Sequence, residues 1–186
     1  GLKLLTELSS GPKVFNVEKF QDSRGTFRMV FQHSVFSSAF PEMPSMMQTN
    51  FVIGNRGSIR GFHGALENKK HWKIVTCSQG HVMHAFIDIR PGSPSYGDIA
   101  VLESNGTKFE SIVIPPGFAY GVQFATQDST LIYSTNIELK NQNEISISPI
   151  SDTFIDLWPE EIILSEKDFS APALSQLIEA GFFSAE

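Results

Sequence analysis

Cysteine is almost absent from this sequence of 186 residues, and its scarcity sets the first limits. The one cysteine, Cys77, excludes an internal disulfide and a zinc site built on several thiolates. It fits the role of a small apolar strand residue. No apolar run approaches the ~20 residues that a membrane span needs. The N-terminus does not resemble a signal peptide, so we expect a cytoplasmic protein without a membrane segment.

Charged residues are also scarce, at 18% of the chain, and acidic residues outnumber basic ones. The formal net charge of -6 argues against a nucleic-acid-binding surface. A local basic pocket for a phosphorylated small molecule is still compatible with this charge. Glycine-rich phosphate loops of the Walker or Rossmann type are absent from the sequence, which removes support for ATP or NAD chemistry on those folds.

What the sequence contains instead is a series of short β-strands separated by turn residues, about one strand per 8–12 residues. The 16 phenylalanines suit an all-β interior. Together these features predict a single domain over residues 1–186 with a sandwich or barrel architecture. The expected strands are Lys13–Val17, Thr26–Phe31, Met47–Ile53, Ser58–His63, Trp72–Ser78, His81–Ile89, Asp98–Leu102, Phe109–Ile114, Ala119–Ala125, Ser129–Asn136 and Glu144–Ile147.

Helix signals are confined to two short segments. Ser34–Phe40 predicts one or two helical turns in the N-terminal third of the chain. Ala171–Ala180 predicts a C-terminal helix, with Pro172 near its start and Gly181 as its stop signal.

The tetrapeptide Arg60-Gly61-Phe62-His63 is the first candidate for chemistry. In a regular strand, Arg60 and His63 would point to opposite faces, because side chains alternate. A glycine within a strand often marks a bend, so Gly61 could bring both side chains to one pocket. The functional interpretation is a cation for an anionic group beside a histidine poised for proton transfer. The alternative is a surface arginine and a hydrogen-bonded core histidine.

A metal site has little support in the sequence. The turn Pro115-Pro116-Gly117-Phe118-Ala119-Tyr120 occurs in many cupins as Pro-x-Gly-x-x-His, whose histidine ligates a metal, and here Tyr120 takes that place. His81 and His84 are three residues apart and therefore lie on opposite faces of a regular strand. Convergent ligands are not visible, so we expect no metal and no other cofactor.

Acid–base groups must then carry any reaction. His63 is the natural general base, and a carboxylate usually orients such a base. Sequence distance does not choose among Asp22, Asp88, Asp98, Asp156 and Asp168. The opposing acid could be a tyrosine, and the chain has only Tyr96, Tyr120 and Tyr133. Tyr133 lies in an alternating strand and faces either a pocket or the core.

Several cations could bind a phosphate group. The candidates are Arg24, Arg56, Arg60, Lys73 and Arg90. Lys73 is inside the apolar strand Trp72-Lys73-Ile74-Val75, where an unpaired ammonium would be costly. Its alternative is an outward-facing strand lysine.

Taken in order, these motifs resemble the sugar-nucleotide 3,5-epimerases typified by dTDP-4-dehydrorhamnose 3,5-epimerase. The resemblance runs from Phe15 to about Asp168, and the combination of motifs is specific although no single one is. The motifs are Asp22-Ser23-Arg24-Gly25-Thr26-Phe27, Gln48-Thr49-Asn50, Ser58-Ile59-Arg60-Gly61-Phe62-His63, Lys73, Asp88-Ile89-Arg90-Pro91-Gly92-Ser93-Pro94-Ser95-Tyr96-Gly97, Ile114-Pro115-Pro116-Gly117-Phe118-Ala119, Tyr133, Asp156-Leu157-Trp158-Pro159 and Leu164-Ser165-Glu166-Lys167-Asp168.

The resemblance implies a cupin-type double-stranded β-helix (jelly roll), a homodimer, no metal and a nucleotide-diphosphate sugar as substrate. It implies that His63, oriented by Asp168, removes a proton next to a C4 ketone, and that Tyr133 returns one on the opposite face. Lys73 would stabilise the charge on the ketone oxygen. Further implied substrate-binding residues are Arg24 and Arg60 on the diphosphate, with Gln48 and Asn50 in the same pocket, and Arg24 could reach the neighbouring subunit's site.

The chain departs from the family pattern at four positions. The family usually has His at Tyr120, Asp at His84, an acidic residue near Met29 and a tyrosine at Leu139. His84 and Tyr120 are therefore further substrate-binding candidates. The expected function is 3,5-epimerisation of a nucleotide-diphospho-4-keto-6-deoxyhexose in deoxysugar biosynthesis. The alternatives are epimerisation at C3 or C5 alone on a CDP-, GDP- or dTDP-linked sugar, a 3,4-ketoisomerase, or a non-catalytic sugar-nucleotide-binding module.

Overall fold

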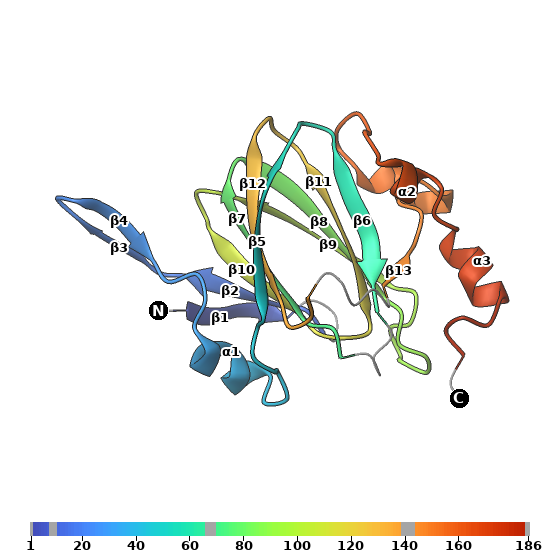
Figure 1. Ribbon diagram of the computed structural model, residues 1–186, viewed down its shortest axis with the longest axis horizontal. Coiled ribbons are helices and arrows are strands. Elements are labelled where there is room, and N and C mark those ends of the chain that lie inside the picture. Colours follow the sequence, from blue (N-terminus) through green and yellow to red (C-terminus); the bar gives the residue numbers. More distant parts are fainter. Residues whose placement is uncertain (1, 8–10, 66–69, 139–143, 185–186) are drawn as a thin grey trace.

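The computed structural model describes residues 2–7, 11–65, 70–138 and 144–184, which form two facing antiparallel β-sheets (Figure 1). The first sheet has the strand order β1-β2-β10-β7-β12-β5. Its strands are β1 (Leu2–Glu7), β2 (Lys13–Val17), β10 (Glu110–Ile114), β7 (Lys73–Gln79), β12 (Ser129–Thr135) and β5 (Gln48–Gly54).

The second sheet has the order β13-β6-β11-β8-β9, so neighbours in space are often distant in sequence. Its strands are β13 (Ile145–Ser146), β6 (Ile59–Gly64), β11 (Phe118–Phe124), β8 (His81–Asp88) and β9 (Ile99–Asn105). Two such sheets, with successive strands crossing from one to the other, form the jelly roll that was expected.

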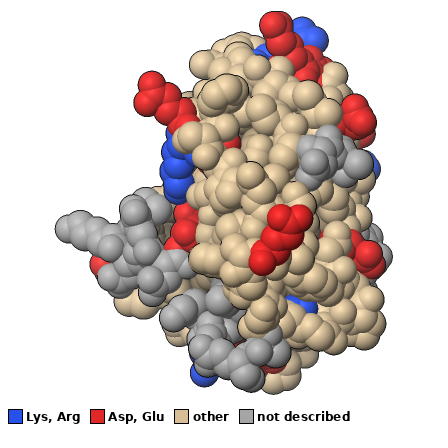
Figure 2. All heavy atoms as spheres, turned by 90° about the vertical axis from the view of Figure 1, so that its right-hand side faces the viewer, with Lys and Arg blue, Asp and Glu red and all other residues tan. Residues whose placement is uncertain are grey.

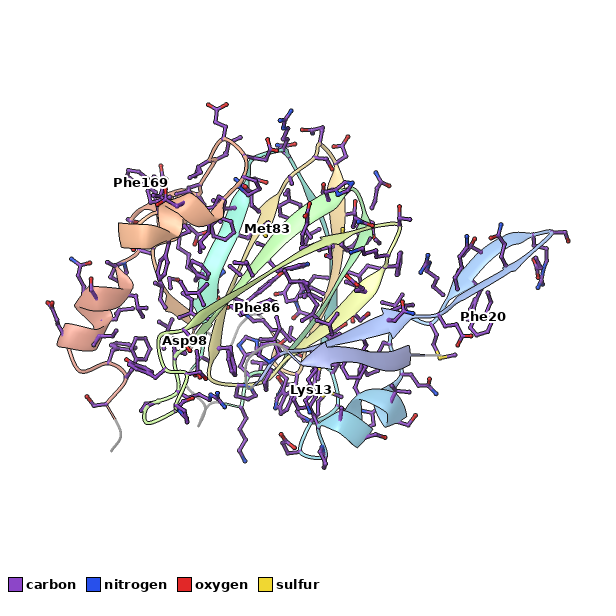
Figure 3. All side chains as sticks on the ribbon, turned by 180° about the vertical axis from the view of Figure 1, so that it is seen from behind. Lys13, Phe20, Met83, Phe86, Asp98 and Phe169 are labelled. Atoms are coloured by element: carbon purple, nitrogen blue, oxygen red, sulfur yellow. The ribbon has the colours of Figure 1, made fainter. Side chains whose placement is uncertain are left out.

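The core lies between the two sheets, because alternate residues of each strand point inward. Val75, Ile112 and Leu131 come from the first sheet, and Phe86 and Val122 come from the second. Figure 3 labels Phe86, whose ring points into this interior. The same inward positions, further along the strands, supply the side chains of the site described below.

A third element leaves this body. β3 (Lys19–Asp22) and β4 (Gly25–Arg28) pair as a two-stranded hairpin that projects away from both sheets, on the left in Figure 1. Phe20, labelled in Figure 3, and Phe27 are exposed on it with their rings 6.3 Å apart. A hairpin of this kind buries little of its own surface against the rest of the chain.

The helices are short. The N-terminal one is α1 (His33–Ala39), which packs its Phe36 against Phe15 at a centroid distance of 4.9 Å. The 3-10 helix η2 (Asp152–Leu157), α2 (Glu166–Phe169) and α3 (Leu174–Glu179) follow the last strand. α2 and α3 lie at the right of Figure 1, on a face where Figure 2 shows scattered charges among many uncharged residues. Within the described ranges, no helix is long and apolar enough to cross a membrane.

Each strand expected from the sequence has a counterpart, with ends shifted by a few residues. The largest differences are at Thr26–Phe31, where β4 ends at Arg28, and at Asp98–Leu102, where β9 continues to Asn105. Both expected helices are present, as α1 and α3. The sequence pattern misses β1 and β3. All four residues of β3 are exposed, so this strand has no alternation between buried and exposed positions to detect.

Candidate active site

A cavity of about 880 Å³ opens between the two sheets. This is large enough to hold a small-molecule ligand. Its apolar part is lined by Val52, Val75, Val122 and Leu131, all from strands. Its polar part is lined by side chains from both sheets, from α2 and from the segments just before β7 and β13. Among these are Arg60, His63, His71, Lys73, Tyr133, Glu144, Lys167 and Asp168.

Gly61 is the reason that Arg60 and His63 reach this one cavity. Its backbone has a φ of +115°, a conformation that side-chain-bearing residues rarely adopt. A Cβ atom there would lie 2.5 Å from the backbone oxygen of Tyr120 on the neighbouring strand. The pairing of β6 with β11 shifts its register at this point. The expected bend is therefore present, and both side chains line the cavity.

His63 is held by the carboxylate of Asp168. The distance from Nε2 of His63 to Oδ1 of Asp168 is 2.7 Å. The other carboxylate oxygen accepts from the backbone N–H of Gly61 at 3.3 Å, and Ser165 caps the backbone N–H of Asp168. Burial raises the pKa of Asp168, but hydrogen bonds and the charge of His63 outweigh it and lower that pKa overall. Of the five candidate aspartates, Asp168 is the one that contacts His63.

Lys73 points into the cavity rather than out of its strand. It is 8% exposed, and its Nζ lies 3.1 Å from Oε1 of Glu144. Burial lowers the pKa of the Lys73 ammonium, although the charge of Glu144 opposes this shift. Lys167 approaches the other carboxylate oxygen of Glu144 at 3.8 Å. The cavity therefore holds two ammonium groups around one carboxylate, next to His63.

Tyr133 lines the cavity from the sheet opposite to that of His63. Burial and the charge of Glu144 raise its pKa above the usual value, so the hydroxyl keeps its proton at neutral pH. Asn50 lies directly across from Tyr133 on β5, and its side-chain oxygen accepts from Gln48 at 2.8 Å. Gln48 and Asn50 share a sheet face with Thr135 and Tyr133, their cross-strand partners, but they are not among the residues that line the cavity.

Tyr120 also lines the cavity, and its hydroxyl lies 2.8 Å from Nδ1 of His84. The other ring nitrogen of His84 lies 2.6 Å from Oγ of Ser104. His84 is fully buried, and burial lowers its pKa to about 3, so the ring is neutral. His81, by contrast, is exposed, so these two histidines do not converge on one point. Across the described residues, no three His, Cys, Asp or Glu side chains are grouped to hold a metal.

The remaining candidate cations have other surroundings. Arg24 is at the tip of the β3–β4 hairpin, where it pairs with Asp22 and is 88% exposed. Arg56 pairs with Glu160 at 2.7 Å, and Arg90 pairs with Asp88 at 2.8 Å. None of the three lines the cavity. Leu139, a departure from the family pattern, lies outside the described residues. Met29 follows β4 and is half-buried, away from the cavity.

Among the polar cavity residues that sequence reasoning missed are His71, Glu144 and Lys167. His71 stands two residues before Lys73, a spacing that puts side chains on one face of an extended chain. Burial and the charge of Lys73 lower the pKa of His71 to about 4. Glu144 carried no local signal, because its partner Lys73 is 71 residues away. Lys167 is next to Asp168 and could have been found from that neighbour.

Fold and site together define a class of protein. A jelly roll with a histidine paired to a buried carboxylate, a protonated tyrosine and a buried lysine in one cavity has the parts for proton transfer at a carbon next to a carbonyl.

Comparison with known proteins identifies the family. A family model described as dTDP-4-dehydrorhamnose 3,5-epimerase matches residues 7–176. The dTDP-4-dehydrorhamnose 3,5-epimerase of Mycolicibacterium smegmatis is 35% identical, over 86% of this chain and 80% of the relative. The chain belongs to the dTDP-4-dehydrorhamnose 3,5-epimerase family, whose members are isomerases.

Solved structures agree in fold. NovW, a 4-keto-6-deoxy sugar epimerase from the novobiocin gene cluster of Streptomyces spheroides, has a TM-score of 0.89 at 26% identity, covering 97% of this chain and 92% of NovW. The epimerase RmlC from Legionella pneumophila, solved in complex with dTDP-4-keto-L-rhamnose, has a TM-score of 0.85 at 25% identity, covering 94% of each chain.

Proposed function

We propose that this protein epimerises C3 and C5 of a nucleotide-diphospho-4-keto-6-deoxyhexose in deoxysugar biosynthesis. The observation that carries the proposal is the placement of His63 and Tyr133 on opposite sheets of one cavity. A sugar ring bound between the sheets would have a base on one face and an acid on the other. This is the arrangement that inversion of a carbon centre requires.

The proposed reaction begins at His63. The ketone at C4 acidifies the hydrogens at C3 and C5, so a neutral imidazole held by Asp168 can remove one of them. The electrons move onto the ketone oxygen, and the product is an enolate. Lys73 is the cation proposed to stabilise that oxygen, since its ammonium is buried in the cavity. Tyr133 then donates its proton to the carbon from the opposite face.

The diphosphate is assigned to the basic side chains of the cavity. Arg60 and Lys167 both line it, and Lys167 is 61% exposed, which leaves its ammonium accessible. Guanidinium and ammonium groups form charge-assisted hydrogen bonds with phosphate oxygens. Gln48 and Asn50 are proposed to belong to the same pocket beside Tyr133, because Asn50 is its direct cross-strand neighbour.

We also propose a homodimer in which Arg24 completes the partner's site. Arg24 is at the tip of a hairpin that projects away from both sheets (Figure 1), and it does not line the cavity of its own chain. The same hairpin exposes Phe20 and Phe27, at 46% and 61%. Exposed aromatic side chains around an arginine are typical of a protein interface.

Mixing two inactive variants tests the dimer. Arg24→Ala and His63→Ala are each expected to be inactive, but subunit exchange between them would form a hybrid dimer with one intact site. Recovery of part of the activity is the expected result. Failure to recover any activity, in samples shown by sedimentation to have exchanged subunits, would place Arg24 in its own subunit's site.

The reaction itself is tested by incubating the protein in deuterated water with dTDP-, CDP- and GDP-linked 4-keto-6-deoxysugars. NMR is expected to show deuterium at C3 and C5 of the sugar. Deuterium at one carbon alone would limit the activity to that position. A ketone that moves to C3 would identify a 3,4-ketoisomerase, and binding without exchange would identify a binding module. Either of these two results would contradict the proposal.

Variants then assign the base. His63→Ala is expected to lose deuterium exchange, because no other described side chain in the cavity is a histidine paired with a carboxylate. The matched control is His81→Ala, which removes an exposed histidine from β8 and should leave the exchange rate unchanged. Equal losses in the two variants would contradict the assignment.

A further inference from the structure

The two hydrogen bonds of the His84 ring indicate which of its nitrogens carries the hydrogen. His84 is on β8, where it shares an inward face with Phe86, labelled in Figure 3. Its two ring nitrogens contact two hydroxyl groups, Tyr120 on β11 and Ser104 on β9. A neutral imidazole carries one N–H, so it donates at one nitrogen and accepts at the other. The neutral ring therefore has two possible arrangements.

Ser104 decides between the two arrangements. Its side chain is 0% exposed, and His84 Nε2 is the hydrogen-bond partner recorded for its hydroxyl within the described part of the chain. If Nε2 carried the hydrogen, the Ser104 hydroxyl hydrogen would be buried without an acceptor, which is costly. The favoured arrangement has Ser104 donating to Nε2. The ring hydrogen is then on Nδ1 and donates to the Tyr120 oxygen.

The consequence appears at Tyr120. Its hydroxyl oxygen accepts from His84, and among the described residues that hydroxyl has no other hydrogen-bond partner, so its own hydrogen is available to donate. Tyr120 lines the cavity, whereas His84 and Ser104 are not among the lining residues. Burial raises the pKa of Tyr120 well above its usual value, so the hydrogen stays on the oxygen near neutral pH. The hydrogen is therefore free to bond to whatever occupies the cavity.

We propose that Ser104 and His84 are positioning residues, which fix the Tyr120 hydroxyl as a hydrogen-bond donor to an oxygen of the bound sugar. Tyr120 pairs with His63 across β11 and β6, which places the donor next to the base. The acceptor is an uncharged or developing negative oxygen, either the ketone or a ring hydroxyl. This inference rests on the proposed epimerase function for its substrate, but the tautomer of His84 does not depend on that function.

The first experiment therefore needs no substrate. Nitrogen-15 NMR of the labelled protein distinguishes a protonated Nδ1 from a protonated Nε2 by their chemical shifts. The expected result for His84 is hydrogen on Nδ1, and Ser104→Ala should lower the fraction of hydrogen on Nδ1, because the serine donor that fixes it there is lost. Hydrogen on Nε2 in the unaltered protein would overturn the proposal even if the epimerase reaction is confirmed.

The second experiment is a double-mutant cycle on the rate of deuterium exchange. Tyr120→Phe and Ser104→Ala are each expected to lower the rate about tenfold, the effect of one lost hydrogen bond. In the Tyr120→Phe background, Ser104→Ala should cost nothing further, because Ser104 acts only through that hydroxyl. Equal losses in both backgrounds, or no loss in either, would overturn the positioning role.

The kinetic constants identify the oxygen that accepts. A loss confined to kcat assigns the donor to the ketone oxygen, where charge develops in the enolate. A loss confined to KM assigns it to a hydroxyl that is bound equally throughout. Thermal unfolding of each variant checks that the fold is retained, and if Ser104→Ala does not fold, His84→Asn tests the same donor. Its side-chain amide can replace Nδ1–H, so it should keep more activity than His84→Leu, and equal activities would overturn the proposal.

Discussion

His63 and His84 lie on strands of the same sheet, separated by β11 alone, but their surroundings differ in the respects that govern proton transfer. The side chain of His63 is 23% exposed to the cavity, and its partner is a carboxylate. His84 is fully buried, and its partners are two hydroxyl groups. A carboxylate stabilises the imidazolium that forms when His63 takes a proton, whereas burial among hydroxyls keeps His84 neutral. His63 is therefore suited to exchange protons, and His84 is suited to fix the direction of a hydrogen bond.

The largest effect on catalysis is expected when Asp168, the carboxylate that pairs with His63, loses its charge. Asp168→Asn keeps the shape of the side chain but cannot stabilise an imidazolium. We expect the rate of deuterium exchange to fall by roughly 10³-fold, within the range for an impaired general base. The matched control is Asp88→Asn, which neutralises a buried carboxylate outside the cavity. Equal losses in the two variants would refute the special role of Asp168.

The pH dependence of the free energy of unfolding tests whether His84 is neutral in the folded protein. Its folded pKa is about 3, against 6.5 for the unfolded chain, so below pH 6.5 the unfolded state binds a proton that the folded state does not. The free energy of unfolding should therefore fall as pH drops from 6.5 towards 3, by on the order of 4 kcal/mol from this residue. Urea unfolding at several pH values measures the slope.

Two variants separate the contributions to that slope. His84→Asn removes the titrating ring and should flatten the slope. His71→Asn should flatten it less, because the folded pKa of His71 is about 4. An unchanged slope in His84→Asn would mean that His84 is not buried as a neutral ring.

The bend at Gly61 can be tested in the same way, because it lets Arg60 and His63, both on β6, line one cavity. Gly61→Ala forces a side chain into a positive φ and against the Tyr120 oxygen. We expect a loss of about 3 kcal/mol in stability. Gly92→Ala, with a φ of +77° and open space around the new Cβ, should cost about 1 kcal/mol. Thermal and urea unfolding test both, and equal costs would show that the contact with Tyr120 is unimportant.

Asp88 is a buried carboxylate that pairs with an arginine, whereas Asp168 pairs with a histidine. Burial raises the pKa of Asp88, but hydrogen bonds from Arg90, Ser95 and Ser93 lower it to about 2. Its stabilisation should be complete above pH 3.8 and lost as pH falls through 2. Asp88→Asn should therefore lower the free energy of unfolding at pH 7 by about 2 kcal/mol. The difference between the variant and the unaltered protein should shrink at pH 2, and a constant difference would contradict this account.

The strands of the body could be predicted from sequence because their alternation reflects a buried and an exposed face. β3 could not, because it has no buried face. The bend at Gly61 was visible, since glycine within a strand is itself a signal. The partner of His63 was not visible from spacing, because 105 residues separate it from Asp168 and four other aspartates were equally possible. The resemblance to a family singled out Asp168.

Glu144 and Ser104 could not be predicted from the sequence. Each acts through a partner on another strand, Lys73 for Glu144 and His84 for Ser104. Neither has a local pattern, because contacts between strands depend on topology and register. Gln48 and Asn50, which the family motif predicts in the pocket, stay a prediction: they lie across from Thr135 and Tyr133 but do not line the cavity.

His63 and Tyr133 are proposed to act on opposite faces of the same carbon, and the variant Tyr133→Phe in deuterated water is the test of that proposal. His63 should still remove the proton and return a deuteron to the same face. NMR of the recovered sugar should therefore show deuterium at C3 or C5 with the original configuration. Inversion by Tyr133→Phe at the rate of the unaltered protein would contradict the claim, because another group would then be supplying the second proton.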